Sequence, residues 1–303
     1  MTASEPLPDA RPANWVDRHA PPRLRPWLKL GRFDRPVGIW LLMLPGWQGA
    51  ALAAAMAHHG PDLSLLGKIF AGAALMRAAG CAYNDIVDRD IDAKVARTAA
   101  RPIPAGQISV KQAGGFVFAC CLASLAILLT LNPLAIGLGA ASLGLVAAYP
   151  FMKRVTWWPQ AWLGLTFNWG ALLGFAAATG HLTPAAGLLY AAGLFWTLGY
   201  DTIYAIQDLE DDALAGVKSS ARRLGARAPS AVLGFYVVSV FLLSIAGGRA
   251  GLGMAFYGLL VVYALQLVWQ ARQVRIDDGA LALRLFKSNT IAGGILFAAL
   301  LFG

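Results

Sequence analysis

Long runs of apolar residues, separated by short polar segments, occupy most of the chain after residue 35. Each run is about 17 to 23 residues long, and a helix of about 20 residues crosses the ~30 Å hydrocarbon layer of a bilayer. The pattern therefore predicts an all-α membrane protein with nine transmembrane helices. We place these helices near residues 36–57, 63–84, 114–132, 133–149, 159–179, 182–204, 230–247, 250–270 and 284–303.

Basic residues are distributed unevenly between the polar segments that join these runs. If the N-terminus is cytoplasmic, the segments on that side hold 22 of the 25 Lys and Arg residues, counting Arg284 and Lys287 at the membrane edge of the last span. The opposite loops hold only Arg249. Cytoplasmic segments of membrane proteins carry such an excess of positive charge. The distribution predicts a cytoplasmic N-terminus and a C-terminus on the opposite side of the membrane.

The composition excludes an ordinary soluble domain. Of the 303 residues, 58% are hydrophobic and only 14% are charged. The net charge of +9 follows the membrane topology, so we expect a lipid bilayer as a partner and no nucleic acid. Three cysteines lie in predicted spans, and an odd, buried set predicts neither a disulfide framework nor a zinc site.

Residues 1–30 are rich in Pro and Arg and contain no long apolar run, so they do not resemble a cleavable secretory signal. We expect a disordered or interfacial N-terminal segment over 1–30, with a basic interfacial helix near 27–35. The remaining residues, 31–303, form the nine-helix domain. Acidic residues near the start, Glu5 and Asp9 among them, argue against a mitochondrial transit peptide. We therefore expect the bacterial cell inner membrane rather than the mitochondrial inner membrane.

Half of the sixteen acidic residues fall in two short segments, and the first lies at the end of the second predicted span. Residues four apart share one face of a helix, so Asn84, Asp88 and Asp92 line up, with Asp85 beside them. Carboxylates on one face repel each other unless a cation lies among them. Oxygen ligands without Cys or His favour Mg²⁺.

The second acidic segment lies at the end of the sixth predicted span, on the same cytoplasmic side. Asp201, Tyr204, Asp208 and Asp212 again follow a spacing of three to four residues. Segments 76–92 and 196–212 are weakly similar, which indicates duplication of a helical unit. We call each row of acidic side chains along a helix a carboxylate ladder. If the two spans are neighbours, the two carboxylate ladders face each other across one cavity.

Basic residues follow each acidic segment, and basic side chains bind phosphate oxygens directly. The alternative role of these cations is membrane topology and contact with lipid headgroups. With an apolar cavity above them, the two ladders favour an enzyme that holds a lipid diphosphate through Mg²⁺. Loss of diphosphate from an allylic chain leaves a carbocation, which aromatic side chains stabilise. The candidate aromatic residues are Tyr83, Tyr149, Phe167, Trp169, Tyr200 and Tyr204.

These residues make the sequence recognisable, because it resembles the UbiA superfamily of intramembrane prenyltransferases over about residues 28–303. The first family motif, NDxxDxxxD, is present in full from Asn84 to Asp92, and the second resembles residues 200–212. Segments 32–38, 149–154 and 159–170 resemble the 4-hydroxybenzoate polyprenyltransferase branch. One departure is Glu210, where the family usually carries Asp; the charge is kept.

The resemblance implies nine helices around a central cavity and Mg²⁺-dependent transfer of a polyprenyl chain from polyprenyl diphosphate. The implied acceptor is the ring carbon ortho to the hydroxyl of 4-hydroxybenzoate, in ubiquinone biosynthesis. The implied ligands of the Mg–diphosphate are Asn84, Asp85, Asp88, Asp92, Asp208, Asp211 and Asp212. The implied catalytic residues among them are Asp88, Asp92, Asp208 and Asp212, and Asp208 is one candidate for the base. The expected diphosphate-binding cations are Lys94, Arg97, Arg101, Lys153 and Lys218.

A benzoate acceptor needs a cationic partner for its carboxylate, and Arg32 and Arg77 are the best candidates, with Tyr204 also expected near the acceptor. Arg77 lies seven residues before Asn84, two helical turns deeper in the membrane. A charge at that depth is costly unless it is paired. The alternative is a structural ion pair with Asp34 or Asp201.

Two further interpretations remain open from the sequence. A prenyltransferase of this family with another acceptor, such as homogentisate, dihydroxynaphthoate or haem B, would carry the same acidic motifs. A cation-coupled transporter is the second alternative, although transporters usually place ionisable residues near the membrane midplane. The length of the prenyl chain and the oligomeric state leave no sequence pattern.

Overall fold

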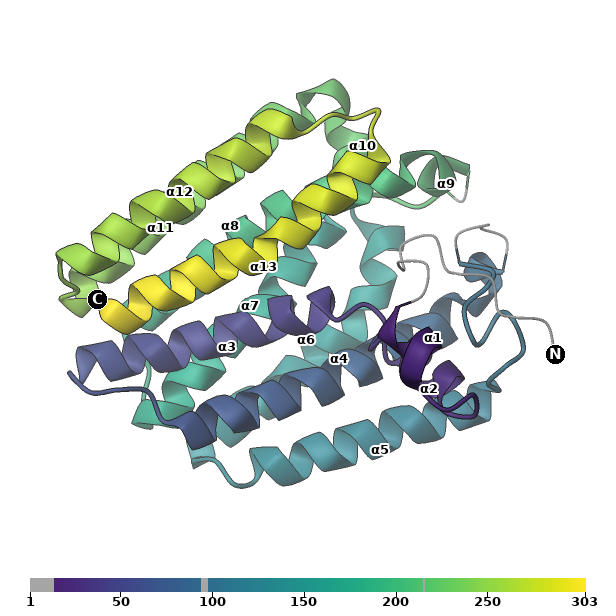
Figure 1. The fold of residues 1–303 in the computed structure, drawn as a ribbon, viewed down its shortest axis with the longest axis horizontal. Coiled ribbons are helices and arrows are strands. Elements are labelled where there is room, and N and C mark those ends of the chain that lie inside the picture. The colour runs from purple at the N-terminus through teal and green to yellow at the C-terminus, as the bar shows by residue number, and fades with distance from the viewer. Residues whose placement is uncertain (1–13, 94–97, 215) are drawn as a thin grey trace. The chain divides into compact units, whose positions relative to one another are not determined.

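The computed structural model describes residues 14–93, 98–214 and 216–303, except for the side chains of Ile91 and Asp211. Every regular element in these ranges is helical, which confirms the predicted all-α class (Figure 1). Nine of the helices have 19 or more residues. They are α3 (Val37–Met56), α4 (Leu63–Asp92), α5 (Val110–Leu128), α6 (Pro133–Val155), α7 (Pro159–Thr179), α8 (Pro184–Tyr204), α11 (Ala228–Ala250), α12 (Met254–Gln273) and α13 (Gly279–Phe302).

Shorter helices lie before and between these long ones. They are α1 (Trp15–His19), α2 (Arg25–Leu30), the 3₁₀ turn η1 (Ala205–Asp208), α9 (Leu209–Leu214), α10 (Ser220–Leu224) and the 3₁₀ turn η2 (Gly225–Arg227). The basic helix expected near 27–35 corresponds to α2, which ends five residues earlier because the chain turns sharply after Leu30.

Eight of the nine long helices in the described residues are long and apolar enough to cross a membrane. The exception is α8, whose position was predicted as the sixth span. It packs against α7, α11 and α13, and most of its residues are buried. Because α8 faces protein rather than lipid, it can carry Thr197, Asp201 and Thr202 where a lipid-facing helix would carry apolar residues. The count of nine spans and the sides of the two termini stay predictions.

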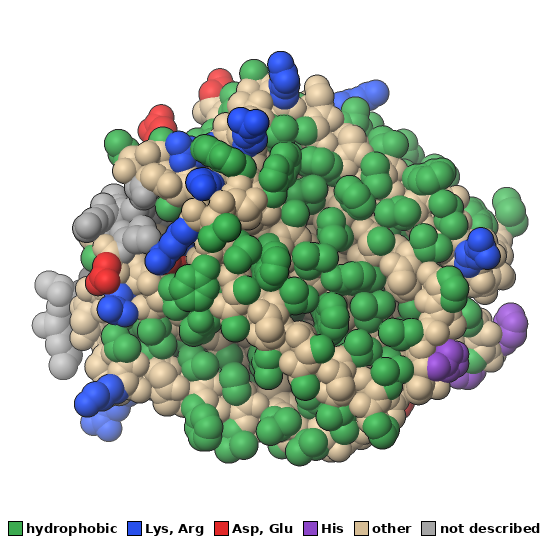
Figure 2. All heavy atoms as spheres, turned by 180° about the vertical axis from the view of Figure 1, so that it is seen from behind, with side chains coloured by type: hydrophobic (Ala, Val, Ile, Leu, Met, Phe, Trp, Pro, Cys, Tyr) green, Lys and Arg blue, Asp and Glu red, His purple; other side chains and the backbone are tan. Residues whose placement is uncertain are grey.

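Two helices continue beyond the spans that were predicted for them. The helix α4 extends to Asp92, two turns past residue 84, and α6 extends to Val155. The polar ends of both helices project past the apolar run. Figure 2 shows hydrophobic side chains over most of the visible face, as expected for helices that contact lipid.

The chain divides into two compact units. The first comprises residues up to 40 and residues 71–127. Its two apolar clusters centre on Leu30 and Ala82, and on Ala78 and Cys120. The second unit comprises residues 41–70 and 128–303. The predicted division into 1–30 and 31–303 stays a prediction.

In the second unit, consecutive helices from α6 to α13 pack against each other, and α13 returns to contact α8 (Figure 1). Glycines bring α3 and α7 into backbone contact. A Cβ at Gly49 would overlap the carbonyl of Ala171, and a Cβ at Gly174 would overlap the carbonyl of Gly46. Small residues allow such close approach between membrane helices.

Candidate active site

The first acidic cluster, which comprises Asn84, Asp85, Asp88 and Asp92, lies on the last three turns of α4. The helix is continuous there, as the spacing predicted. Asp85, Asp88 and Asp92 are 1%, 0% and 6% exposed, and Asn84 is half-buried. Three buried carboxylates on one helix face require cations nearby.

Arg32 supplies one of these cations. Its Nη2 donates to both carboxylate oxygens of Asp85, at 2.7 and 2.9 Å. Arg32 has a φ of 59°, which is uncommon for a residue other than glycine. The position is the left-handed residue of a Schellman motif that ends α2, in which Phe33 N donates to Leu28 O and Arg32 N donates to Lys29 O. A glycine would relax the backbone there, but it would remove the ion pair.

Arg101 supplies the second cation. Its Nη1 donates to Asp92 Oδ2 at 2.8 Å and to Asp85 Oδ1 at 3.1 Å. The segment before it is fastened to the helix end, because the buried hydroxyl of Thr98 donates to the carbonyl of Asp92 at 2.8 Å. Thr98 was not predicted, since a lone Thr after an acidic segment carries no distinctive pattern. Arg101 therefore bridges two carboxylates of the cluster.

Two other predicted cations of this loop, Lys94 and Arg97, lie outside the described residues. Arg32 was predicted to bind the acceptor carboxylate, and Arg101 was predicted to bind the diphosphate. The structure shows them bound to the acidic cluster, and their roles toward substrates stay predictions.

The donor set of the first cluster fits a hard cation, since it consists of buried carboxylates and one amide oxygen. Within the described residues, however, no three acidic, His or Cys side chains are already arranged to hold a metal ion. Arg101 lies between Asp85 and Asp92 and supplies the positive charge that these carboxylates need. The chemistry of the residues therefore suits Mg²⁺, although they do not form a complete ligand cage.

The second acidic cluster, which comprises Asp201, Tyr204, Asp208 and Asp212, does not lie on one α-helix. The helix α8 ends at Tyr204, η1 follows over Ala205–Asp208, and α9 then carries Asp212. A 3₁₀ turn has about three residues per turn, so side chains four apart no longer line up across it. The prediction of a second regular helical ladder is therefore wrong. The four side chains are half-buried, and the side chain of Asp211 lies outside the described residues.

Cations near the second cluster donate to main-chain carbonyls. Lys218 Nζ donates to Val155 O at 3.2 Å, and its main-chain N donates to the carbonyl of Lys153 at 2.9 Å. Arg222 Nη1 donates to Asp212 O at 3.2 Å and to Val217 O, and its guanidinium lies 5.5 Å from the centroid of the Trp157 ring. These bonds order the segment that follows α9 and connect it to the end of α6.

An aromatic group lies where α8 meets α13. The ring centroid of Phe286 lies 4.5 Å from that of Tyr204 and 5.8 Å from that of Tyr200. The buried Tyr200 hydroxyl also accepts a hydrogen bond from Thr197 Oγ1 at 3.1 Å, which fixes its orientation. Tyr200 and Tyr204 were predicted as cavity aromatics. Phe286 was missed, since one aromatic residue among Arg284, Leu285 and Lys287 shows no pattern.

Arg77 of α4 is half-buried and lies against Gly38 at the start of α3. A Cβ at Gly38 would lie 2.5 Å from Arg77 Nε and 2.7 Å from Nη2. Only glycine at position 38 leaves room for the guanidinium in this position. The role of Arg77 in acceptor binding stays a prediction.

Comparisons with known proteins agree with the resemblance seen in the sequence. The chain is 45% identical over 292 residues to the mitochondrial 4-hydroxybenzoate polyprenyltransferase of Arabidopsis thaliana, and the match covers 96% of this chain and 72% of the relative. It is 45% identical over 285 residues to the protein of the same name from Homo sapiens, covering 94% and 76%.

The names of these relatives correct the predicted location. Both relatives are named as mitochondrial proteins, which overturns the prediction of a bacterial inner membrane. That prediction gave weight to the three acidic residues within 1–30, and the pattern of a targeting segment is too weak for three acidic residues to exclude one.

Solved structures show the same fold. A UbiA homologue from Aeropyrum pernix K1, in its apo form, superposes with a TM-score of 0.73 at 27% identity, covering 84% of this chain and 96% of that chain. A UbiA homologue from Archaeoglobus fulgidus, bound to GPP and Mg²⁺, gives 0.69 at 19% identity, covering 91% and 98%. The model of the UbiA prenyltransferase family matches residues 42–300. The chain is therefore a member of the UbiA prenyltransferase family.

Proposed function

We propose that this chain transfers a polyprenyl group from polyprenyl diphosphate to the ring carbon ortho to the hydroxyl of 4-hydroxybenzoate, with Mg²⁺, in ubiquinone biosynthesis. Relatives 45% identical carry the name of this activity, and a neighbour of the same fold was solved with GPP and Mg²⁺. The observation that carries the proposal is the face of three buried carboxylates on α4, held by Arg32 and Arg101. Family membership leaves no support for the transporter alternative.

The two acidic clusters hold the diphosphate through the metal. Asn84, Asp88 and Asp92 would be the ligands from the first cluster, and Asp208, Asp211 and Asp212 would be those from the second. When bound, Mg²⁺ neutralises negative charge on the departing diphosphate. Asp85 does not need to bind the metal, because Arg32 already engages both of its oxygens. Its role is to hold Arg32 and Arg101 in place.

Basic side chains complete the diphosphate site. Arg101 neutralises Asp85 and Asp92 in this structure, and if these carboxylates held Mg²⁺, Arg101 would be available to donate to phosphate oxygens. Lys153 and Lys218 are the proposed diphosphate-binding cations of the second unit, where the end of α6 contacts the segment before α10. Lys94 and Arg97 belong to the same site.

Arg77 is the proposed partner of the acceptor carboxylate. Arg32 is less available for this role than Arg77, because both Asp85 oxygens hold its guanidinium. The ring of Tyr204, packed on Phe286, forms one wall of the acceptor site. In this arrangement the acceptor lies deeper in the membrane than the diphosphate, since Arg77 lies two helical turns before Asn84 on α4.

The test is an assay of the purified protein in detergent with a polyprenyl diphosphate, 4-hydroxybenzoate and Mg²⁺. We expect prenylated 4-hydroxybenzoate with Mg²⁺ and none after chelation of the metal, with activity restored when Mg²⁺ is returned. Release of diphosphate without modification of 4-hydroxybenzoate would keep the reaction class and reject this acceptor. Homogentisate and dihydroxynaphthoate then serve as the competing acceptors. No product from any donor and acceptor in folded protein would reject the proposal.

A further inference from the structure

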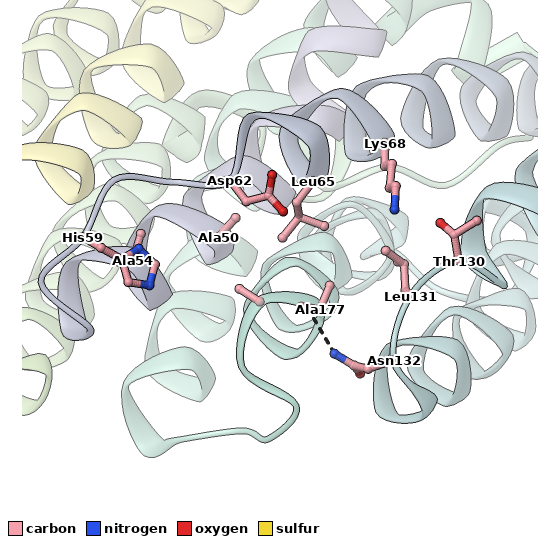
Figure 3. Close-up of a pocket in the computed structure, with 11 residues that line it drawn as sticks. Ala50, Ala54, His59, Asp62, Leu65, Lys68, Thr130, Leu131, Asn132 and Ala177 are labelled. Atoms are coloured by element: carbon pink, nitrogen blue, oxygen red, sulfur yellow. Dashed lines mark hydrogen bonds between the residues drawn. The ribbon is translucent and has the colours of Figure 1, made fainter.

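A separate cavity of about 260 Å³ lies within the second unit (Figure 3). Its walls come from the end of α3, the start of α4, the turn before α6 and the end of α7. The lining residues are Ala50, Ala54, His59, Asp62, Leu65, Lys68, Thr130, Leu131, Asn132, Ala177 and Ala178. The cavity lies at the C-terminal end of α7, whereas the second acidic cluster begins in the last turn of its antiparallel neighbour α8. The proposed active site does not use it.

Lys68 is the residue of the cavity that most needs a partner. It lies in the second turn of α4 and is half-buried, and Figure 3 shows its side chain directed toward the turn that carries Thr130 and Leu131. Among the residues that the structure describes, its ammonium group makes no hydrogen bond or ion pair. A lysine at the edge of a membrane span is costly to bury without an anionic or oxygen partner.

The other polar residues of the wall do not satisfy Lys68. The side-chain N of Asn132 donates to Ala176 O at 2.7 Å and to Ala177 O at 3.1 Å, and its oxygen accepts from Ala135 N. Asp62 accepts from the main-chain N of Ser64 at 2.8 Å and forms no ion pair with Lys68. The cavity therefore offers one cation and, at a separate position, one carboxylate.

The remaining surroundings are apolar. Ala50 and Leu65 belong to a packed cluster with Trp47 and Leu131, which forms a rigid floor. Leu129, directly before the lining turn, is 60% exposed, and Leu134, two residues after it, is 37% exposed. A ligand that places a small charged group in the cavity and long apolar chains on the outer surface would fit these features.

We propose that this cavity binds the headgroup of a phospholipid, on the side of the bundle opposite the second acidic cluster. The Lys68 ammonium donates to a phosphodiester oxygen, and Asp62 accepts from the ammonium of a zwitterionic headgroup such as ethanolamine. Phospholipid phosphates lie at the depth of helix ends, where basic side chains of membrane proteins meet them. The acyl chains lie along Leu129 and Leu134.

The test measures how much phosphatidylethanolamine the full chain retains after delipidation in detergent, by native mass spectrometry. Diacylglycerol with the same chains lacks the phosphate, and inorganic phosphate lacks the chains. We expect retention of phosphatidylethanolamine about tenfold above that of diacylglycerol, because a charge-assisted hydrogen bond is lost in the latter. We expect no displacement by millimolar inorganic phosphate.

Three variants test whether the retained phosphatidylethanolamine occupies this cavity. Lys68→Gln should lower retention about tenfold, while Lys111→Gln, an equal charge change on an exposed residue of α5, should not. Ala178→Phe fills the cavity from an exposed position without altering charge, and it should also lower retention. Prenyl transfer should be unchanged in all three. Equal retention by wild type and Lys68→Gln, equal retention of diacylglycerol, or displacement by inorganic phosphate would each overturn the proposal.

Discussion

The two acidic clusters have similar carboxylate spacing along the chain but lie on different main-chain structures. In the first cluster, arginine side chains bind the carboxylates directly, since Arg32 holds Asp85 and Arg101 bridges Asp85 and Asp92. In the second cluster, Lys218 and Arg222 donate to main-chain carbonyls. The carboxylates of the first cluster are buried, whereas those of the second are half-buried.

This difference shows that similar acidic motifs are stabilised in different ways. Buried carboxylates need counter-charges in the folded protein, and the first cluster obtains them from two arginines. The second cluster spans a change from α-helix to 3₁₀ turn, and Lys218 and Arg222 order the segment that follows α9. The first cluster is therefore a preformed electrostatic site on one face of a continuous α-helix, while the second is distributed over α8, η1 and α9.

The strongest test of the comparison removes one carboxylate from each cluster. We expect Asp88→Asn and Asp208→Asn each to lower kcat for prenyl transfer about 100- to 1000-fold, as loss of a group that stabilises developing charge does. Steady-state kinetics with a polyprenyl diphosphate measures this effect. Equal losses would mean that both clusters serve the same step despite their different surroundings.

Matched controls exist within both acidic segments. The side chain of Asp90 is 82% exposed and pairs only loosely with Arg89 at 3.6 Å, and Glu210 is exposed. Asp90→Asn and Glu210→Gln should keep nearly full activity. If these controls lose as much activity as the cluster variants, total negative charge rather than position would explain the effect.

A second test concerns stability. Arg32→Leu leaves Asp85 buried with one partner fewer, so we expect the free energy of unfolding in mixed micelles to fall by about 3 kcal/mol. Arg222→Leu removes hydrogen bonds to carbonyls and should cost only about 1 kcal/mol. The double variant Arg32→Leu/Asp85→Leu should recover most of the loss. If Arg32→Leu and Arg222→Leu lower the free energy of unfolding equally, the proposed difference between the two clusters is wrong.

A third test concerns the competition between Arg101 and the metal, and it depends on the proposed function. Arg101→Gln should raise the affinity for Mg²⁺ about tenfold without substrate and lower it with a non-hydrolysable diphosphate analogue, an effect within the usual range of coupling between two ligands. Isothermal titration calorimetry measures both affinities. Arg89→Gln, whose side chain is 47% exposed, is the control. Unchanged Mg²⁺ affinity in the Arg101 variant would contradict the bridging role.

Much of the helical framework was predictable from the sequence. Apolar runs of membrane-spanning length placed the long helices to within about six residues of their starts, because the bilayer thickness limits span length. The continuation of α4 through the first cluster followed from four-residue spacing. The break between α8 and α9 could not be predicted, since residues 201–212 show the same spacing without a glycine or proline to mark the change.

The partners of the charged residues were not predictable either. Arg32 and Asp85 are 53 residues apart, and Arg101 and Asp85 are 16 apart across a loop. Such pairs depend on how the end of α2 and the loop after α4 fold back, which periodicity does not encode. The sequence showed that Gly38 belongs to a family-like segment. The reason, space for the Arg77 guanidinium, is visible only in three dimensions.

The smallest expected effect on kinetics is that of Gly38→Ala. This variant tests whether Arg77 acts on the acceptor, independently of the two acidic clusters. The added Cβ would displace the Arg77 guanidinium without removing its charge, because it would lie 2.5 Å from Nε. We expect KM for 4-hydroxybenzoate to rise about fivefold, or ~1 kcal/mol, with KM for the diphosphate unchanged. Gly80→Ala is the control, since no atom lies within 4 Å of its added Cβ. If KM for 4-hydroxybenzoate is unchanged in both Gly38→Ala and Arg77→Leu, Arg77 has a purely structural role. If KM for the diphosphate rises instead, Arg77 acts together with the charged residues of the first cluster.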